Sequence, residues 1–114
     1  MKSDRTYLLH IRDAIERIEG YASHGHEAFL EESHWQDGIV RQLEIVGEAT
    51  KHLSGEFRQA HPQVPWQRMA GLRDVLIHDY MGVDLEAVWD IVRNRISELK
   101  SQVTAALSEP AGQD

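Results

Sequence analysis

The chain has 114 residues, the size of one domain, and 41% of them are hydrophobic, which is enough for a packed core. It contains no cysteine, so disulfides, thiolate metal sites and cysteine nucleophiles are excluded. With 12 Lys and Arg against 19 Asp and Glu, the formal net charge is −7. This balance disfavours broad, non-specific nucleic-acid binding, although it leaves room for a local basic cleft.

No signal peptide is visible at the beginning of the chain. Met1 to Arg5 lead directly into a charged amphipathic pattern, without the apolar region of a signal peptide. No apolar run approaches the ~18 residues of a membrane span. We therefore expect a cytoplasmic protein without a membrane anchor.

The first predicted helix covers Asp4 to Ala22. Asp4 is a plausible N-cap, and the segment His24-Gly25-His26 interrupts the pattern. Apolar residues recur at steps of three and four, as on one face of a helix: Tyr7, Leu8, Ile11, Ile15, Ile18 and Ala22.

A second helix is predicted from Ser33 to Leu53, where Ser54-Gly55 is expected to close it. Gly47 lies inside this helix, at a cost of ~1 kcal/mol relative to alanine. We therefore expect another helix to approach closely at Gly47. The apolar face consists of Ile39, Leu43, Val46 and Leu53.

A connector is expected from Glu56 to Val64, and Pro65 suits the first turn of a third helix. This helix should run through Trp66, Met69, Leu72 and Leu76 to Tyr80, and Gly82 should end it.

Asp84 is the predicted N-cap of a long fourth helix that reaches Leu107. The pattern as a whole predicts an all-α, antiparallel four-helix bundle. Residues 1–107 should form this one domain, followed by a flexible, polar tail over residues 108–114. The fourth apolar stripe has nearly heptad spacing and comprises Leu85, Val88, Trp89, Val92, Ile96, Leu99, Val103 and Leu107.

The segment Arg73-Asp74-Val75-Leu76-Ile77-His78-Asp79-Tyr80 holds the most reactive set of side chains. An arginine can stabilise negative charge on a phosphate, and a histidine can move protons. On an ideal helix Arg73 and Tyr80 share a face, whereas His78 lies ~140° away from Arg73. A local distortion, or a second copy in a two-fold dimer, would bring the two side chains together.

The same residues also allow a purely structural interpretation. Arg73 can pair with a neighbouring carboxylate, and His78 can interact favourably with the end of a helix. Tyr80 can belong to the core with its hydroxyl at the edge. Spacing alone favours this interpretation.

The pattern Arg73-x4-His78-x-Tyr80 resembles the signature of HepT-like toxins, a branch of the HEPN superfamily. The resemblance extends to other segments and spans Tyr7 to Leu107, nearly the whole chain. The supporting segments are Ile45-Val46-Gly47-Glu48-Ala49, the residues Trp66, Met69 and Gly71, and the start of the fourth helix from Val83-Asp84 to Val88-Trp89.

This resemblance implies a helical, dimeric, metal-independent endoribonuclease toxin that cleaves RNA with Arg73 and His78 and needs no cofactor. It further implies a partner, an MntA-type nucleotidyltransferase antitoxin that transfers AMP to Tyr80, as in type VII-like toxin–antitoxin pairs. Asp74 departs from the asparagine common in the family, and it can either weaken activity or orient His78. The alternative is a non-catalytic HEPN-type binding module that docks a nucleotidyltransferase.

Arg93 and Arg95 begin the basic part of the fourth helix. They can line an RNA path, and a solvated helix face is an equal alternative. The three tryptophans are expected to be core or interface anchors: Trp35, Trp66 and Trp89.

The remaining histidines offer weaker signals. His52 and His61 are expected at the surface. His24, His26 and His34 lie near Glu27, Glu31 and Glu32, but they lack fixed ligand spacing. We therefore predict a solvated loop there and no metal site.

Overall fold

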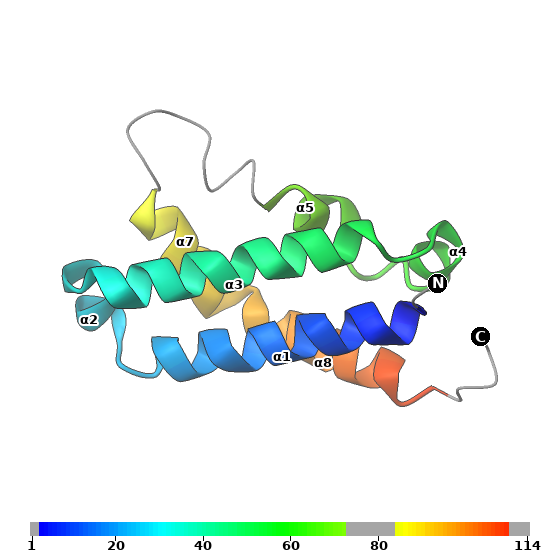
Figure 1. Cartoon of the computed structure of the whole chain (residues 1–114), viewed down its shortest axis with the longest axis horizontal. Coiled ribbons are helices and arrows are strands. Elements are labelled where there is room, and N and C mark those ends of the chain that lie inside the picture. The colour runs from blue at the N-terminus through cyan, green and yellow to red at the C-terminus, as the bar shows by residue number, and fades with distance from the viewer. Residues whose placement is uncertain (1–2, 73–83, 110–114) are drawn as a thin grey trace.

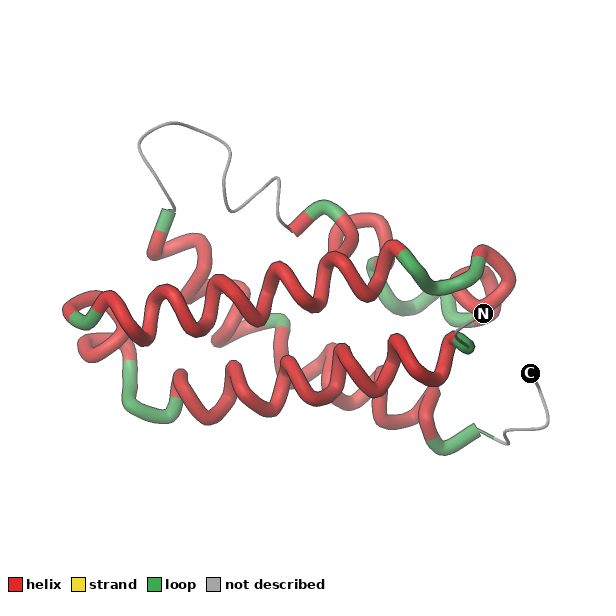
Figure 2. The backbone as a smooth tube through the Cα atoms, viewed as in Figure 1, coloured by secondary structure: helices red, strands yellow, loops and turns green. Residues whose placement is uncertain are grey.

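The computed structural model describes residues 3–72 and 84–109. Every regular element within these residues is an α-helix, which confirms the predicted all-α class, and short loops join the helices (Figure 2). The helices are α1 (Asp4–Ala22), α2 (His26–Glu31), α3 (Ser33–Lys51), α4 (Gly55–Ala60), α5 (Trp66–Ala70), α7 (Leu85–Asn94) and α8 (Ile96–Leu107).

The long helices α1 and α3 form the centre of the bundle. They lie side by side and antiparallel, with α2 at the end where the chain reverses (Figure 1). Helix α8 packs along α1, and α5 packs against α3. The result is a helical bundle of the predicted kind.

The predicted apolar stripes form the core. The side chains of Ile11, Ile15 and Ile18 from α1 are completely buried, as are those of Leu43 and Val46 from α3. Burying one such side chain contributes roughly 1.5–3 kcal/mol to folding. The regular spacing of these residues is therefore enough to explain why α1 and α3 pair along their length.

The N-cap of α1 differs from the prediction. Ser3 caps the helix, because its side chain accepts a hydrogen bond from the backbone N–H of Thr6. The carboxylate of Asp4 instead accepts hydrogen bonds from the backbone N–H of Ser54 at 2.7 Å and from its hydroxyl at 2.8 Å. Asp4 thus holds a distant loop.

The segment after α3 was also predicted wrongly. Helix α3 ends at Lys51, and Ser54 begins α4 by accepting the backbone N–H of Phe57 at 3.0 Å. The expected connector therefore contains a short helix. A serine whose side chain accepts the backbone N–H three residues later favours the start of a helix. This preference of Ser54 prevails over the tendency of Gly55 to end the preceding helix, and Gly55 does not adopt a left-handed conformation.

The fourth helix was predicted as continuous but is broken at Arg95. Asp84 caps α7 as expected, accepting the N–H of Ala87 at 3.1 Å. No proline or glycine lies between Leu85 and Leu107, so neither of these residue types causes the break. The break allows α7 to contact α2 through Trp89 while α8 packs along α1.

The third predicted helix is interrupted at Gly71, within its described part. Helix α5 ends at Ala70, with Gly71 as its C-cap, and Leu72 is helical again. The predicted continuation to Tyr80 and the stop at Gly82 lie outside the described residues. The expected close approach at Gly47 is confirmed, because α5 crosses α3 there.

Candidate functional site

The motif residues Arg73, Asp74, His78 and Tyr80 lie outside the described residues. The structure instead describes the two elements that flank them in the chain. Helix α5 and Leu72 precede the motif, and Asp84 with α7 follows it. These two elements fix the positions at which the chain enters and leaves the motif segment.

Helix α5 is firmly attached to the bundle. Trp66 and Met69 are buried, and the indole N–H of Trp66 donates to the carbonyl of His61 at 2.9 Å. The ring of Phe57 packs edge-on against the Trp66 indole. This confirms the prediction for Trp66 as a core anchor and fixes the element that leads into Arg73.

Helix α7 is attached through aromatic contacts. The indole of Trp89 lies 5.1 Å from the ring of His26 and 5.2 Å from that of Phe29, measured between ring centroids. The Nε2 atom of His26 is 2.9 Å from a carboxylate oxygen of Glu86. Trp89 therefore connects α7 to α2, as expected of an anchor.

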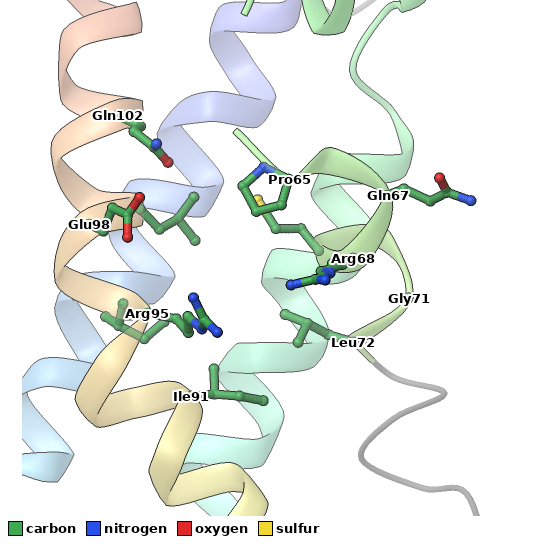
Figure 3. Close-up of a pocket in the computed structure, with 12 residues that line it drawn as sticks. Pro65, Gln67, Arg68, Gly71, Leu72, Ile91, Arg95, Glu98 and Gln102 are labelled. Atoms are coloured by element: carbon green, nitrogen blue, oxygen red, sulfur yellow. The ribbon is translucent and has the colours of Figure 1, made fainter. Parts of the chain in front are cut away.

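A groove of about 680 Å³ lies between α5 and the α7–α8 junction (Figure 3). We call it the α5–α8 groove. Its lining is mainly apolar and also includes polar side chains. The residues that line it are Pro65, Gln67, Arg68, Met69, Gly71, Leu72, Ile91, Arg95, Ile96, Glu98, Leu99 and Gln102.

The two predicted RNA-path arginines have different surroundings. Both are exposed, but Arg95 lines the α5–α8 groove and Arg93 does not. Arg68 of α5 also lines it, and the sequence patterns gave no indication of this residue. The periodicity of apolar residues identifies buried helix faces, but it does not predict which exposed arginines lie on the two sides of a groove.

A second depression of about 600 Å³ lies between α1 and α3. The ring of Tyr7 stacks on His52 at 5.0 Å, and His52 lies 3.8 Å from Glu48. Carboxylates of Glu44 and Glu48 face this depression together with Arg41. Such a mixed charge suits a phosphate less well than the α5–α8 groove does.

The residues His24, His26 and His34 are exposed, as predicted, but only His24 lies in a loop. His26 begins α2, and His24 stacks on Trp35 at 4.0 Å. His34 lies 4.4 Å from the same indole. The described residues contain no group of three or more side chains that could hold a metal ion.

His61 was predicted at the surface, yet only 12% of its side chain is exposed. Its Nδ1 lies 3.0 Å from the carbonyl oxygen of Phe57, and its Nε2 lies 2.8 Å from a carboxylate oxygen of Glu109. Burial lowers the pKa of His61, but these two acceptors outweigh it and raise the pKa above 6.5. His52 is exposed as predicted.

Comparison with known proteins decides the family. A family model described as "Ribonuclease HepT-like" matches residues 11–106. The chain belongs to the HepT-like ribonuclease family. This match begins in α1, ends in α8 and covers the segment that carries the motif, so the resemblance inferred from the motif is confirmed.

Curated relatives agree with the HepT-like assignment. A "Putative RNase" of Caldanaerobacter subterraneus is 42% identical, over 96% of this chain and 98% of its own length. The "Probable ribonuclease HepT" of Thermococcus cleftensis is 41% identical, over 89% of this chain and 93% of its own length. A "Gamma-glutamylcyclotransferase and putative RNase" of Methanocaldococcus jannaschii is 39% identical over 95% of this chain, which spans 49% of that protein.

No solved structure matches the chain significantly. Among the described helices of this HepT-like protein, none is long and apolar enough to cross a membrane.

Proposed function

We propose that this protein is an endoribonuclease that cleaves RNA with Arg73 and His78, without a metal ion. The observation that carries the proposal is the HepT-like match over residues 11–106, which includes the pattern Arg73-x4-His78-x-Tyr80. Arginine and histidine are the residue types that this reaction requires.

The proposed reaction uses the nucleophile that RNA itself carries. His78 removes the proton of a ribose 2′-hydroxyl, and the oxygen attacks the adjacent phosphorus. Arg73 stabilises the extra negative charge on the phosphate oxygens. The bond from phosphorus to the 5′-oxygen breaks, which leaves a 2′,3′-cyclic phosphate and, after protonation, a 5′-hydroxyl.

A two-fold dimer is part of this proposal. Arg73 and His78 would diverge by ~140° on an ideal helix, so residues from two copies can complete one site. Asp74 beside Arg73 would then either orient His78 or repel the phosphate. Asp74→Asn distinguishes these roles, because cleavage falls in the first case and rises in the second.

We further propose that the protein is a toxin of a type VII-like pair, acting on RNA in the cytoplasm. Its partner would be an MntA-type nucleotidyltransferase antitoxin. In the proposed transfer, the Tyr80 oxygen attacks the α-phosphate of ATP, a tyrosyl–AMP bond forms and pyrophosphate leaves. The added phosphate would repel RNA from the site.

The test is expression of the chain alone, beside Arg73→Ala and His78→Ala, followed by analysis of cellular RNA. We expect growth arrest and cleaved RNA for the wild type, and neither for the two variants. Arg17→Ala is the control, because this exposed arginine of α1 lies on another element. Circular dichroism should show the same helix content for all four proteins.

Metal independence is tested with the purified protein and RNA. Cutting should persist in EDTA, and the products should carry a 2′,3′-cyclic phosphate. Cleavage that disappears in EDTA and returns with a divalent cation would overturn the mechanism.

The second candidate is a non-catalytic module that docks a nucleotidyltransferase. The net charge of −7 favours it, because an acidic surface attracts RNA poorly. A wild-type protein that binds the transferase but neither arrests growth nor cuts RNA would support this candidate.

A further inference from the structure

Two guanidinium groups meet in the α5–α8 groove. Figure 3 shows Arg68 extending from α5 and Arg95 extending from the α7–α8 junction into the same space. Arg95 occupies the break between the two helices. The break in the fourth helix therefore coincides with the residue that faces Arg68.

Among the described residues, neither guanidinium has an ion-pair partner that would explain its position. In the part of the chain that the structure describes, Arg68 and Arg95 form no ion pair and no side-chain hydrogen bond. The protein has 19 acidic residues, so carboxylate partners are plentiful. Two cations that converge without an ion-pair partner repel one another, and an anion bound between them would offset this repulsion.

The walls of the groove add an apolar surface to this positive charge. Met69, Ile96 and Leu99 are buried beneath it, and Leu72 and Ile91 are partly exposed in its lining. A volume of about 680 Å³ falls in the range of small-molecule sites. The matching ligand is an anion attached to a flat group with apolar faces, and a nucleotide has this chemistry, since the faces of its base are apolar and its edges are polar.

We propose that the α5–α8 groove is a subsite for one nucleotide of the RNA substrate, next to the cleavage site. Arg68 and Arg95 hold a phosphate, and the apolar walls receive the attached base. Arginine pairs well with phosphate because its planar fork can donate two parallel hydrogen bonds. The proposal rests on the proposed function, because it assumes that the ligand is RNA.

The position of the groove agrees with this role. Leu72 lines it and directly precedes Arg73 in the chain, so the subsite borders the segment that carries the reactive residues. Glu98 also lines the groove and partly opposes the two arginines. Its carboxylate can accept a hydrogen bond from an exocyclic amino group of a base.

The test measures binding of short single-stranded RNA by fluorescence anisotropy in the His78→Ala background, so that the RNA stays intact. Arg68→Gln and Arg95→Gln should each weaken binding about tenfold at low salt. Each should also reduce the slope of log affinity against log salt, by at most about 0.7, the value for one phosphate that is no longer neutralised on a single strand.

Arg17→Gln is the matched control. It removes the same charge from an exposed arginine of α1 that does not line the groove. We expect its effect to stay below about twofold. Equal losses in all three variants would mean general electrostatic attraction and would overturn the proposal, as would normal binding by Arg68→Gln and Arg95→Gln.

The base is tested with an abasic oligomer of the same length. Its affinity should be lower than that of RNA and should still depend on Arg95. Equal affinities would overturn the assignment of the apolar walls to a base.

A protein contact is the competing use of the groove. If Leu72→Asp lowers the molar mass in light scattering while RNA binding is unchanged, the groove contacts a second copy and the proposal is wrong. Failure of the proposed function is seen separately: a wild type that binds RNA through Arg95 but never cuts it contradicts the ribonuclease activity alone.

Discussion

Gly47 of α3 faces the backbone of Met69 so closely that a Cβ atom on it would lie 3.1 Å from the Met69 carbonyl oxygen. Such a Cβ would also lie 3.6 Å from the Cβ of Leu72. The absence of a side chain at Gly47 therefore sets how near α5 can come to α3. Because α5 precedes Arg73 in the chain, this contact fixes the position of the helix that leads to the proposed active-site residues.

We predict that Gly47→Val destabilises the protein by about 1–3 kcal/mol, because the added methyl groups must displace a backbone carbonyl rather than a flexible side chain. Urea unfolding followed by circular dichroism gives the free energy of unfolding. Gly20→Ala is the control, since nothing lies within 4 Å of a Cβ there. That change in α1 should stabilise by about 0.5–1 kcal/mol. A Gly47→Val protein as stable as the wild type would contradict the predicted contact.

His61 should make stability depend on pH. Both ring nitrogens face acceptors, so the charged form is favoured and the pKa is raised in the folded state. The stabilisation is complete below the unfolded pKa of ~6.5 and is lost as pH rises through the folded pKa. The free energy of unfolding should fall between pH 6 and pH 8 more in the wild type than in His61→Gln.

The control for this titration is Glu109→Gln, which keeps a side chain of similar size but removes its charge. An NMR titration of the His61 ring should give a lower pKa in this variant than in the wild type. An unchanged pKa would show that Glu109 does not hold the proton on His61.

We predict that the protein is a dimer in solution. Light scattering at micromolar concentration should give twice the 13.1 kDa mass of the chain, because one copy would not bring Arg73 and His78 to the same phosphate on a straight helix. A monomeric mass would require that the segment bends instead.

Tyr80 is predicted to be the position of modification. Incubation with the proposed MntA-type nucleotidyltransferase, ATP and magnesium should add AMP-sized mass to the wild type. Tyr80→Phe should gain none, because it lacks the hydroxyl that attacks ATP. If Tyr80→Phe gains the same mass, another residue accepts AMP. If the wild type gains none, neutralisation by simple occlusion becomes the better hypothesis.

Helices α1 and α3 could be predicted from the sequence almost to the residue, because a single apolar stripe decides them locally. The predictions that were wrong, or that the sequence did not allow, have a different physical origin. The break at Arg95 and the near burial of His61 depend on which distant segments pack together. The convergence of Arg68 and Arg95 is likewise tertiary, since both are exposed residues without any periodic pattern. The reactive pattern itself, by contrast, is visible in the sequence because its spacing is short.

Helix α4 is held at both ends by residues from the two extremities of the described chain. Asp4 binds Ser54 at its start, and Glu109 binds His61 at its end. Arg5 joins these extremities through a 2.9 Å hydrogen bond to the carbonyl of Leu107. We therefore expect a truncation that removes Asp4 or Glu109 to weaken the attachment of α4. Removal of either contact should make α4 the first segment that proteases cut. The hydrogen bond from Arg5 to Leu107 holds the first and last described helices together, so a circular permutant that joins them with a linker should keep the fold.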